Sequence, residues 1–294
     1  MMKRIIVGSR ESRLAVVQTM GLVDHLRAAL PDTEVRVETM KTTGDRILDR
    51  TLDKVGGKGL FVKELDAALL EGRIDLAVHS VKDMPMELTP GTQILAWSRR
   101  EDPRDALVLP EGAPGFRPGG TIGTSSLRRS LQLKRLYPDC EIRPVRGNLF
   151  TRLQKLDDGQ VDALVLAMAG LKRLGMERRA WRVFEPDEII PAAGQGVLAV
   201  VGREGETFPG LNGYADDSVG QCVACERAFV RALDGGCSSP VCAHATVYKG
   251  ILTVRALYWD PDTGEMRTGI DCSSARDAEL IGKRLAERLR SSAG

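Results

Sequence analysis

Three polar side chains directly follow an apolar run at residues 74–78 that predicts a β-strand. They are Ser80, Lys82 and Asp83. Loops at the carboxyl ends of strands in open α/β sheets hold ligands, so the carboxylate of Asp83 is a candidate acid, base or electrostatic stabiliser. The alternative is an inert surface pair of Lys82 and Asp83, worth under about 1 kcal/mol. We interpret the adjacent His79 as structural.

The thiol of Cys237 is a second candidate for chemistry. Gly235 and Gly236 precede it and Pro240 follows it, so this cysteine lies in a flexible turn. An accessible thiol in such a turn can act as a nucleophile or as a point of covalent attachment.

The cysteines also leave a metal site open as an alternative. The spacing of four of them allows a four-thiolate zinc site: Cys222, Cys225, Cys237 and Cys242. Against this, residues 222–229 have the pattern of a continuous helix, and we expect no metal. We interpret Cys140 and Cys272 as ordinary packing residues.

Residues 54–63 contain three glycines within four positions, beside Lys54 and Lys58. Glycine permits positive φ and a close approach of the backbone to a ligand, and the lysines can hold anions. The spacing of a Walker phosphate-binding loop is absent. The alternative interpretation is a mobile surface loop.

A predicted strand at residues 121–123 leads directly into a predicted helix. Thr124 and Ser126 supply hydroxyl groups, and Arg128 and Arg129 lie in the first helical turn. A helix N-terminus favours an anion, whereas two cations there oppose the helix dipole. We therefore expect a bound anion to offset the arginines. The alternative is a helix capped by Ser125 or Ser126, with solvated arginines.

Other arginines follow predicted strands in a similar way. Arg10 follows the first strand, Arg146 follows a later one, Arg152 lies in the next predicted helix, and Arg173 lies beside Lys172. Arginine binds carboxylates in a bidentate manner. Convergent arginines from two α/β domains imply a polyanionic ligand in a cleft between them, although each arginine alone is more typical of a solvated surface.

Strand and helix patterns alternate through the first two hundred residues. Strands are predicted at 3–8, 34–40, 74–78, 106–109, 121–123, 141–145, 163–167 and 197–202, and helices at 11–30, 60–70, 126–137 and 148–156. This alternation predicts α/β units with parallel or mixed sheets. The charged stretch 99–104 predicts a hinge, and the strand at 197–202 predicts a return to the first domain. No internal repeat is evident.

The last third of the chain has a different pattern. Residues 208–220 have the composition of a polar, glycine-rich linker, and a helix is predicted at 225–233. Strands at 243–248 and 251–259 are separated by Lys249 and Gly250, which predict a tight hairpin. A third strand at 267–272 and an amphipathic helix at 275–289 complete a small α+β domain.

The composition excludes several classes of protein. The 294 residues carry 42 basic and 40 acidic side chains, a net charge of +2 that gives no nucleic-acid signature. No apolar run approaches the roughly 20 residues of a membrane-spanning helix. The N-terminal segment has the pattern of a strand and not of a signal peptide. We expect a cytoplasmic protein with no membrane and no nucleic-acid partner.

Together these motifs resemble the porphobilinogen deaminase (hydroxymethylbilane synthase) family. Besides the segments above, the matching motifs are residues 8–15 (GSRESRLA), 100–105 (REDPRD), 146–148 (RGN), 169–175 (AGLKRLG), 191–196 (PAAGQG) and 233–237 (LDGGC). So many motifs in the same order along the chain are highly specific. Two departures are Arg13, where many members have Pro, and Met84, where many have Val.

The resemblance implies three domains, and we expect a monomer. Two α/β domains similar to periplasmic binding proteins would flank a cleft, and a small α+β domain with a three-stranded antiparallel sheet would carry the cofactor. We place domain 1 at residues 1–98, completed by 195–217, domain 2 at 99–194 and the C-terminal domain at 218–294.

The resemblance also implies a transferase that joins four porphobilinogen molecules head to tail and releases four ammonia molecules and hydroxymethylbilane. Cys237 would hold a dipyrromethane cofactor by a thioether, and Asp83 would contact pyrrole N–H groups and stabilise the cation left by loss of ammonia. The groups expected to bind substrate or cofactor come from both α/β domains: Arg10, Ser12, Lys54, Lys58, Ser80, Lys82, Thr124, Ser126, Arg128, Arg129, Arg146, Gly147, Asn148, Arg152, Arg173 and Gln195.

Two other classes stay open as alternatives. A non-catalytic binding module for a small polycarboxylate would keep the arginines and the hinge, but it would not use Asp83 as an acid or Cys237 as a thiol. A zinc-dependent interaction domain at the C-terminus would require stoichiometric zinc.

Overall fold

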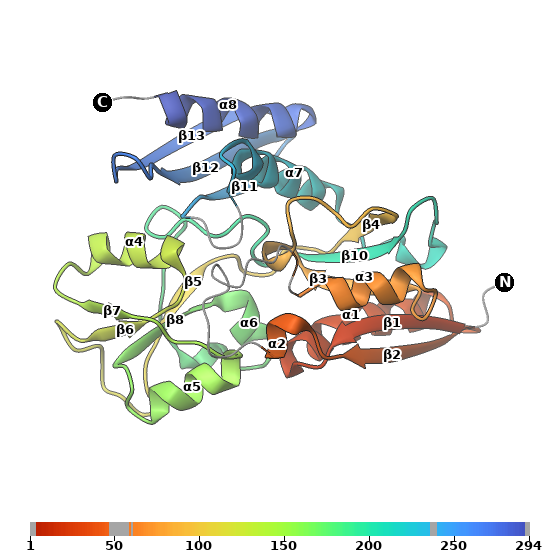
Figure 1. The fold of residues 1–294 in the computed structure, drawn as a ribbon, viewed down its shortest axis with the longest axis horizontal. Helices are drawn as coiled ribbons and strands as arrows, with labels where there is room; N and C mark the ends of the chain where they lie inside the picture. Colours follow the sequence, from red (N-terminus) through yellow and green to blue (C-terminus); the bar gives the residue numbers. More distant parts are fainter. Residues whose placement is uncertain (1–3, 47–58, 60, 236–239, 292–294) are drawn as a thin grey trace. The chain divides into compact units, whose positions relative to one another are not determined.

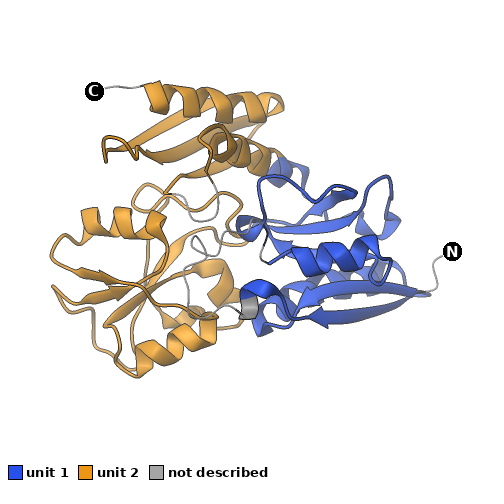
Figure 2. Ribbon diagram, viewed as in Figure 1, with its two compact units in different colours: residues 1–100, 197–220 blue, residues 101–196, 221–294 orange. Residues whose placement is uncertain are grey.

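The structure is a computed structural model that describes residues 4–46, 59, 61–235 and 240–291. The chain divides into two compact units (Figure 2). One consists of Met1–Arg100 and Val197–Gly220, and the other of Glu101–Gly196 and Gln221–Gly294. The first unit contains one sheet and the second contains two (Figure 1).

The first unit is built on a five-stranded mixed sheet. Its strands lie in the order β2 (Glu34–Met40), β1 (Arg4–Arg10), β3 (Leu76–Ser80), β10 (Leu198–Arg203) and β4 (Thr92–Trp97). β1 is parallel to β2 and β3, and β10 is antiparallel to β3 and β4. The helices of this unit are α1 (Arg13–Ala29), α2 (Thr43–Arg46) and α3 (Lys63–Leu70).

Helices α1 and α3 pack against opposite faces of this sheet. Successive side chains of a strand point to opposite faces. Val7 of β1 belongs to the core formed with Leu22 and Leu26 of α1. The next residue, Gly8, faces α3, and a Cβ added there would lie 2.8 Å from Leu65 Cδ2. Gly8 therefore allows α3 to pack closely against the strand that leads to Arg10.

The second unit contains a sheet of the same size and design. Its strands lie in the order β7 (Glu141–Arg143), β6 (Thr121–Gly123), β8 (Ala163–Ala167), β5 (Asp105–Val108) and β9 (Ala180–Val183). β6 is parallel to β7 and β8, and β5 is antiparallel to β8 and β9. Its helices are α4 (Leu127–Leu136), α5 (Leu149–Asp157) and α6 (Met168–Arg173).

The two five-stranded sheets form an internal structural repeat. Gly8 pairs with Ala77 in the first sheet and Gly123 pairs with Leu164 in the second. In the same way Leu198 pairs with Ser80, and Asp105 pairs with Ala167. In each sheet the antiparallel fourth strand follows a crossing of the chain from the other unit. The sequence showed no repeat because the equivalent side chains differ.

A three-stranded antiparallel sheet forms the rest of the second unit. It contains β11 (Cys242–Tyr248), β12 (Ile251–Trp259) and β13 (Met266–Ser274), with helix α8 (Ala278–Ser291) packed on it. Helix α7 (Asp217–Ala232) precedes it. The predicted hairpin is confirmed, since Lys249 and Gly250 have φ of 49° and 78° between the paired residues Tyr248 and Ile251.

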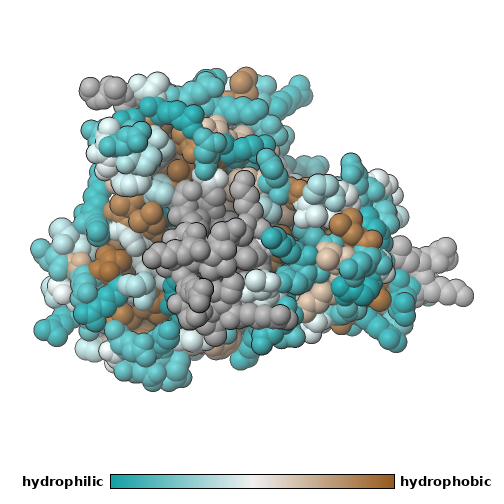
Figure 3. Space-filling model, in the orientation of Figure 1, coloured by the Kyte–Doolittle hydropathy of each residue, from teal (hydrophilic) through white to brown (hydrophobic). Residues whose placement is uncertain are grey.

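The predicted fold class is confirmed in its α/β sheets and its antiparallel C-terminal sheet. The predicted linker at 208–220 is wrong in part, because it contains a short 3₁₀ helix at Pro209–Leu211 and the start of α7. In the described part of the chain, no helix is long and apolar enough to cross a bilayer. On the face shown in Figure 3, hydrophilic side chains predominate and apolar ones form small separate groups.

Candidate functional site

A pocket of about 90 Å³ lies within the first unit. It collects five residues that the sequence analysis selected: Arg10, Ser12, Ser80, Lys82 and Asp83. They come together because β1 and β3 are adjacent and parallel, so that their carboxyl ends meet at one edge of the sheet. Asp83 is the one carboxylate among the described residues that line the pocket.

The backbone around Asp83 is held by hydrogen bonds within the unit. A short 3₁₀ helix, Val81–Asp83, follows β3. The Val81 N–H donates to Val197 O at 3.1 Å, and the Met84 N–H donates to Val81 O at 3.1 Å. These bonds fix the position from which the Asp83 side chain enters the pocket, and the side chain is only partly exposed.

Two residues of the pocket wall were not identified from the sequence. The guanidinium carbon of Arg10 lies 4.3 Å from the centre of the Phe61 ring, so the ring stacks with a cation. Gln18 of α1, six residues after Ser12, also lines the pocket. An isolated Phe or Gln gives no functional signal in a sequence, because packing residues of these types are common.

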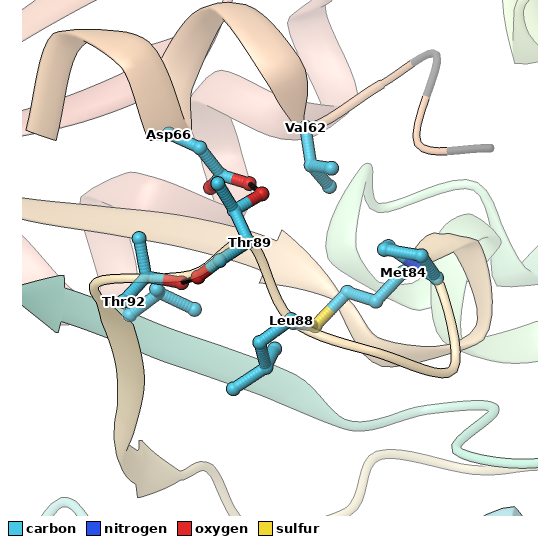
Figure 4. A pocket seen from close by; sticks show the side chains of 8 residues that line it. Val62, Asp66, Met84, Leu88, Thr89 and Thr92 are labelled. Atoms are coloured by element: carbon cyan, nitrogen blue, oxygen red, sulfur yellow. Dashed lines mark hydrogen bonds between the residues drawn. The ribbon is translucent and has the colours of Figure 1, made fainter. Parts of the chain in front are cut away.

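A buried group of polar side chains adjoins this pocket, and one of its members, His79, lines it. His79 and Asp66 are 5% exposed each, and His79 Nε2 lies 3.8 Å from Asp66 Oδ1. Thr89 donates its hydroxyl to Asp66 Oδ2 at 2.5 Å, at the wall of a second, smaller cavity (Figure 4). Burial, with the charge of Arg10, lowers the pKa of His79 to about 4, and burial raises the pKa of Asp66. The interpretation of His79 as structural agrees with this burial.

The contribution of His79 to the stability of the protein should fall when the pH is lowered from 6.5 toward 4. The unfolded chain protonates His79 near pH 6.5, but the folded chain does so only near pH 4, so stability is lost across that window. Between pH 7 and pH 5 this loss is about 2 kcal/mol. Urea unfolding at both pH values should show that His79→Gln loses less stability than the wild type. Equal losses in the two proteins would contradict the assignment.

Arg128 and Arg129 are interior residues, which corrects the expectation of solvated or purely ligand-binding arginines. They are 5% and 6% exposed, and both contact Asp105, which is fully buried. Arg128 Nη2 lies 2.8 Å from Asp105 Oδ2, and Arg129 Nη2 lies 2.7 Å from Asp105 Oδ1. The anion that offsets these cations at the start of α4 is therefore in part a carboxylate of the chain itself.

The cluster around Asp105 has one positive charge in excess, since two guanidiniums face one carboxylate. These guanidiniums keep the pKa of Asp105 well below its usual range despite burial. The Nε atom of Arg129 is buried and has no hydrogen-bond partner among the described residues. A buried site with two positive charges and one negative charge favours the binding of a further anion.

Gln195 belongs to the same buried cluster. Its side chain is 1% exposed and donates from Nε2 to Pro103 O at 2.6 Å and to Asp105 Oδ1 at 2.9 Å. That Gln195 helps to line a ligand cleft stays a prediction, and the structure shows its side chain buried with these two hydrogen bonds.

Several predicted binding residues of the second unit shape its loops. Ser126 caps α4 by accepting from Arg129 N at 3.5 Å, and Asn148 caps α5 by accepting from Thr151 N at 2.9 Å. Thr124 is buried, and its hydroxyl accepts a hydrogen bond from Ser126 N. Gly147 has a φ of 117°, and its carbonyl oxygen accepts from Arg152, while the carbonyl oxygen of Arg146 accepts from Lys155. Arg173 donates a hydrogen bond to Gly196 O.

The described cysteines do not form a metal site. No group of three or more potential ligands comes together in the described ranges, and Cys222, Cys225 and Cys242 are buried. Burial raises the pKa of Cys225 and of Cys242 to about 12, which makes them inert thiols.

Cys272 is exposed, so its interpretation as a packing residue is wrong. Lys54, Lys58 and Cys237 lie outside the described residues.

Comparisons with known proteins cover almost the whole chain. The family described as "Porphobilinogen deaminase, dipyromethane cofactor binding domain" matches residues 5–208, and "Porphobilinogen deaminase, C-terminal domain" matches residues 220–291. A porphobilinogen deaminase of Ruminiclostridium josui is 48% identical over 293 residues, 99% of each chain. One of Thiobacillus denitrificans is 46% identical over 292 residues, 98% of this chain and 95% of that one.

Solved structures overlap with the chain more weakly. The periplasmic aliphatic sulphonate binding protein SsuA from Escherichia coli is 13% identical, covers 80% of this chain and 71% of its own, and has a TM-score of 0.40.

Proposed function

The chain belongs to the porphobilinogen deaminase family, and from this premise we propose which of its residues carry the reaction. The enzyme deaminates porphobilinogen and joins it into hydroxymethylbilane on a dipyrromethane cofactor. The observation that supports our assignment best is the pocket where Asp83 lies with two cations, Arg10 and Lys82.

We assign the central catalytic role to Asp83. Loss of ammonia from porphobilinogen leaves a cation, and a partly buried carboxylate fixed by the backbone stabilises positive charge as it develops. The same carboxyl group can pass a proton to the leaving amine and can accept a hydrogen bond from the pyrrole N–H. Arg10 and Lys82, with the hydroxyls of Ser12 and Ser80, would hold the carboxylates of the substrate.

The residues of the second unit fit an anionic cofactor. The excess positive charge of the Asp105 cluster and the unpartnered Nε of Arg129 would both be satisfied by a ligand carboxylate. Cys242 is the first residue of β11 and follows Cys237 by five residues. The positive charge of Arg128 acts to lower the pKa of the Cys242 thiol, against the larger effect of burial. We propose that Cys237 attaches the dipyrromethane and that Arg128, Arg129, Arg146, Arg152 and Arg173 hold the carboxylates of the cofactor and of the substrate units added to it. When bound, the cofactor supplies the pyrrole carbon to which the first porphobilinogen is joined.

Intact-mass measurement of the denatured protein tests the attachment. Protein made in cells that synthesise porphobilinogen should exceed its sequence mass by two porphobilinogen units, each less one ammonia, because a thioether survives denaturation. Cys237→Ala should have the bare mass. Cys272→Ala is the matched control, since it removes an exposed thiol of the same unit, and it should keep the adduct. A wild-type protein with the bare sequence mass would refute the proposal.

We further propose that the protein acts as a monomer in the cytoplasm, without nucleic acid. The near balance of 42 basic and 40 acidic side chains supports the last point. The division into three domains, at 1–98 with 195–217, 99–194 and 218–294, is also our proposal.

A further inference from the structure

The turn at residues 191–196 is bonded to several parts of the second unit. Gln195 Nε2 donates to Asp105 Oδ1, the carboxylate that holds Arg128 and Arg129. Gly196 O accepts from Arg173 Nη2 at 2.7 Å. A displacement of this turn would therefore move the partners of three arginines to which we assign cofactor and substrate carboxylates.

A buried carboxylate from helix α7 fixes this turn. Glu226 is fully buried, and its Oε2 accepts from Gly194 N at 2.6 Å. Its other oxygen, Oε1, accepts from Ala245 N of β11 at 2.8 Å. His244 Nδ1 lies 3.6 Å from the same Oε1. One side chain thus joins α7, the first strand of the C-terminal sheet and the 191–196 turn.

The length and charge of Glu226 both matter for this link. A fully buried carboxylate is stable only when N–H groups or cations satisfy it, and each of its oxygens here has a backbone N–H. Gly194 has a φ of 72°, a conformation that favours glycine, so the N–H that faces Glu226 depends on a special backbone geometry. In Glu226→Gln, the side-chain amide would point its own N–H group at one of the two backbone N–H donors, and the hydrogen bond from that donor would be lost.

We propose that Glu226 is a positioning residue for anion binding: it fixes the 191–196 turn to α7 and so holds Gln195, Asp105 and the arginines Arg128, Arg129 and Arg173 in their binding arrangement. The inference rests on the function proposed above. In the sequence, α7 ends at Ala232, shortly before Cys237, the cysteine to which we assign the cofactor.

Glu226→Gln in the full chain tests this role. We expect the KM for porphobilinogen to rise at least five-fold, while kcat per cofactor-bearing molecule, counted by intact mass, changes less than two-fold. Amide hydrogen exchange of the peptide spanning 191–196 should accelerate at least ten-fold. Asp260→Asn is the matched control, because Asp260 also accepts two backbone N–H bonds, from Asp262 and Thr263, in the loop between β12 and β13. It should leave KM and the exchange of the turn unchanged.

An unchanged KM and unchanged exchange in folded Glu226→Gln would overturn the inference. If that variant does not fold, Glu226→Asp keeps the charge but is too short to reach both N–H groups, and the same KM and exchange changes are expected of it. A wild-type protein without the adduct or without turnover would refute the proposed function instead, so the two failures are distinguishable.

Discussion

Asp83→Asn should lower kcat about 10²–10³-fold and leave the fold intact. Asparagine keeps the shape of the side chain but removes the negative charge that stabilises the cation formed when ammonia leaves. Loss of one preorganised electrostatic contact costs about 3–4 kcal/mol in the transition state. Asp83 is only partly buried, and the nearby hydrogen bonds are made by the backbone of Val81 and Met84, so the fold does not depend on its charge.

Steady-state turnover and far-UV circular dichroism of the variant would measure the two parts of this prediction. Glu87→Gln is the control, because it removes a negative charge from an exposed position four residues along the same loop, outside the pocket lining. It should retain at least half of the wild-type activity. An Asp83→Asn enzyme that also retained half would exclude a catalytic role for this carboxylate.

Asp105→Asn should destabilise the second unit by about 3–5 kcal/mol, because it leaves two buried guanidiniums without their carboxylate. Both arginines donate other bonds, Arg128 to Ile190 O at 2.7 Å and Arg129 to Val165 O at 3.0 Å, so neither can turn to solvent without breaking them. Urea unfolding at neutral pH gives the change in the free energy of unfolding. A change below about 1 kcal/mol would show that the cluster does not stabilise the fold.

A double-mutant cycle separates charge from packing in this prediction. Arg128→Leu alone should cost less, about 1.5–3 kcal/mol, since Asp105 keeps its contact with Arg129. The double variant, Asp105→Asn with Arg128→Leu, has one buried cation in place of two. It should therefore be more stable than the sum of the single changes by at least about 1 kcal/mol. Additive effects would indicate that the repulsion between the guanidiniums is unimportant.

The sequence was sufficient for features that depend on neighbouring residues. The strands β2, β6 and β8 were predicted with the bounds that the structure has, and the hairpin at Lys249 and Gly250 was predicted from its turn residues. Placement of Asp83 at the end of a strand followed from the apolar run before it. Local propensity and turn chemistry act over a few residues, so a single sequence contains this information.

Strands whose place depends on distant partners were harder to predict. β4 and β9 are edge strands of the two sheets and were not expected. β9 has only four residues, and β4 lacks strict alternation. Such strands are stabilised by pairing with β10 and β5, which approach from other parts of the chain.

The sequence by itself determined the α/β pattern, the hairpin and the strand-end position of Asp83. Only the tertiary structure decided which charged groups pair inside the protein. Arg128 and Arg129 meet Asp105 because β5 enters the sheet beside β8, which brings a carboxylate 23 residues earlier in the chain to the start of α4. His79 and Asp66, and Glu226 and Gly194, are brought together in the same way. Burial and these partners then shift the pKa values of His79, Asp66 and Asp105, because the desolvation of a charged group depends on the surrounding packing and not on its neighbours in sequence.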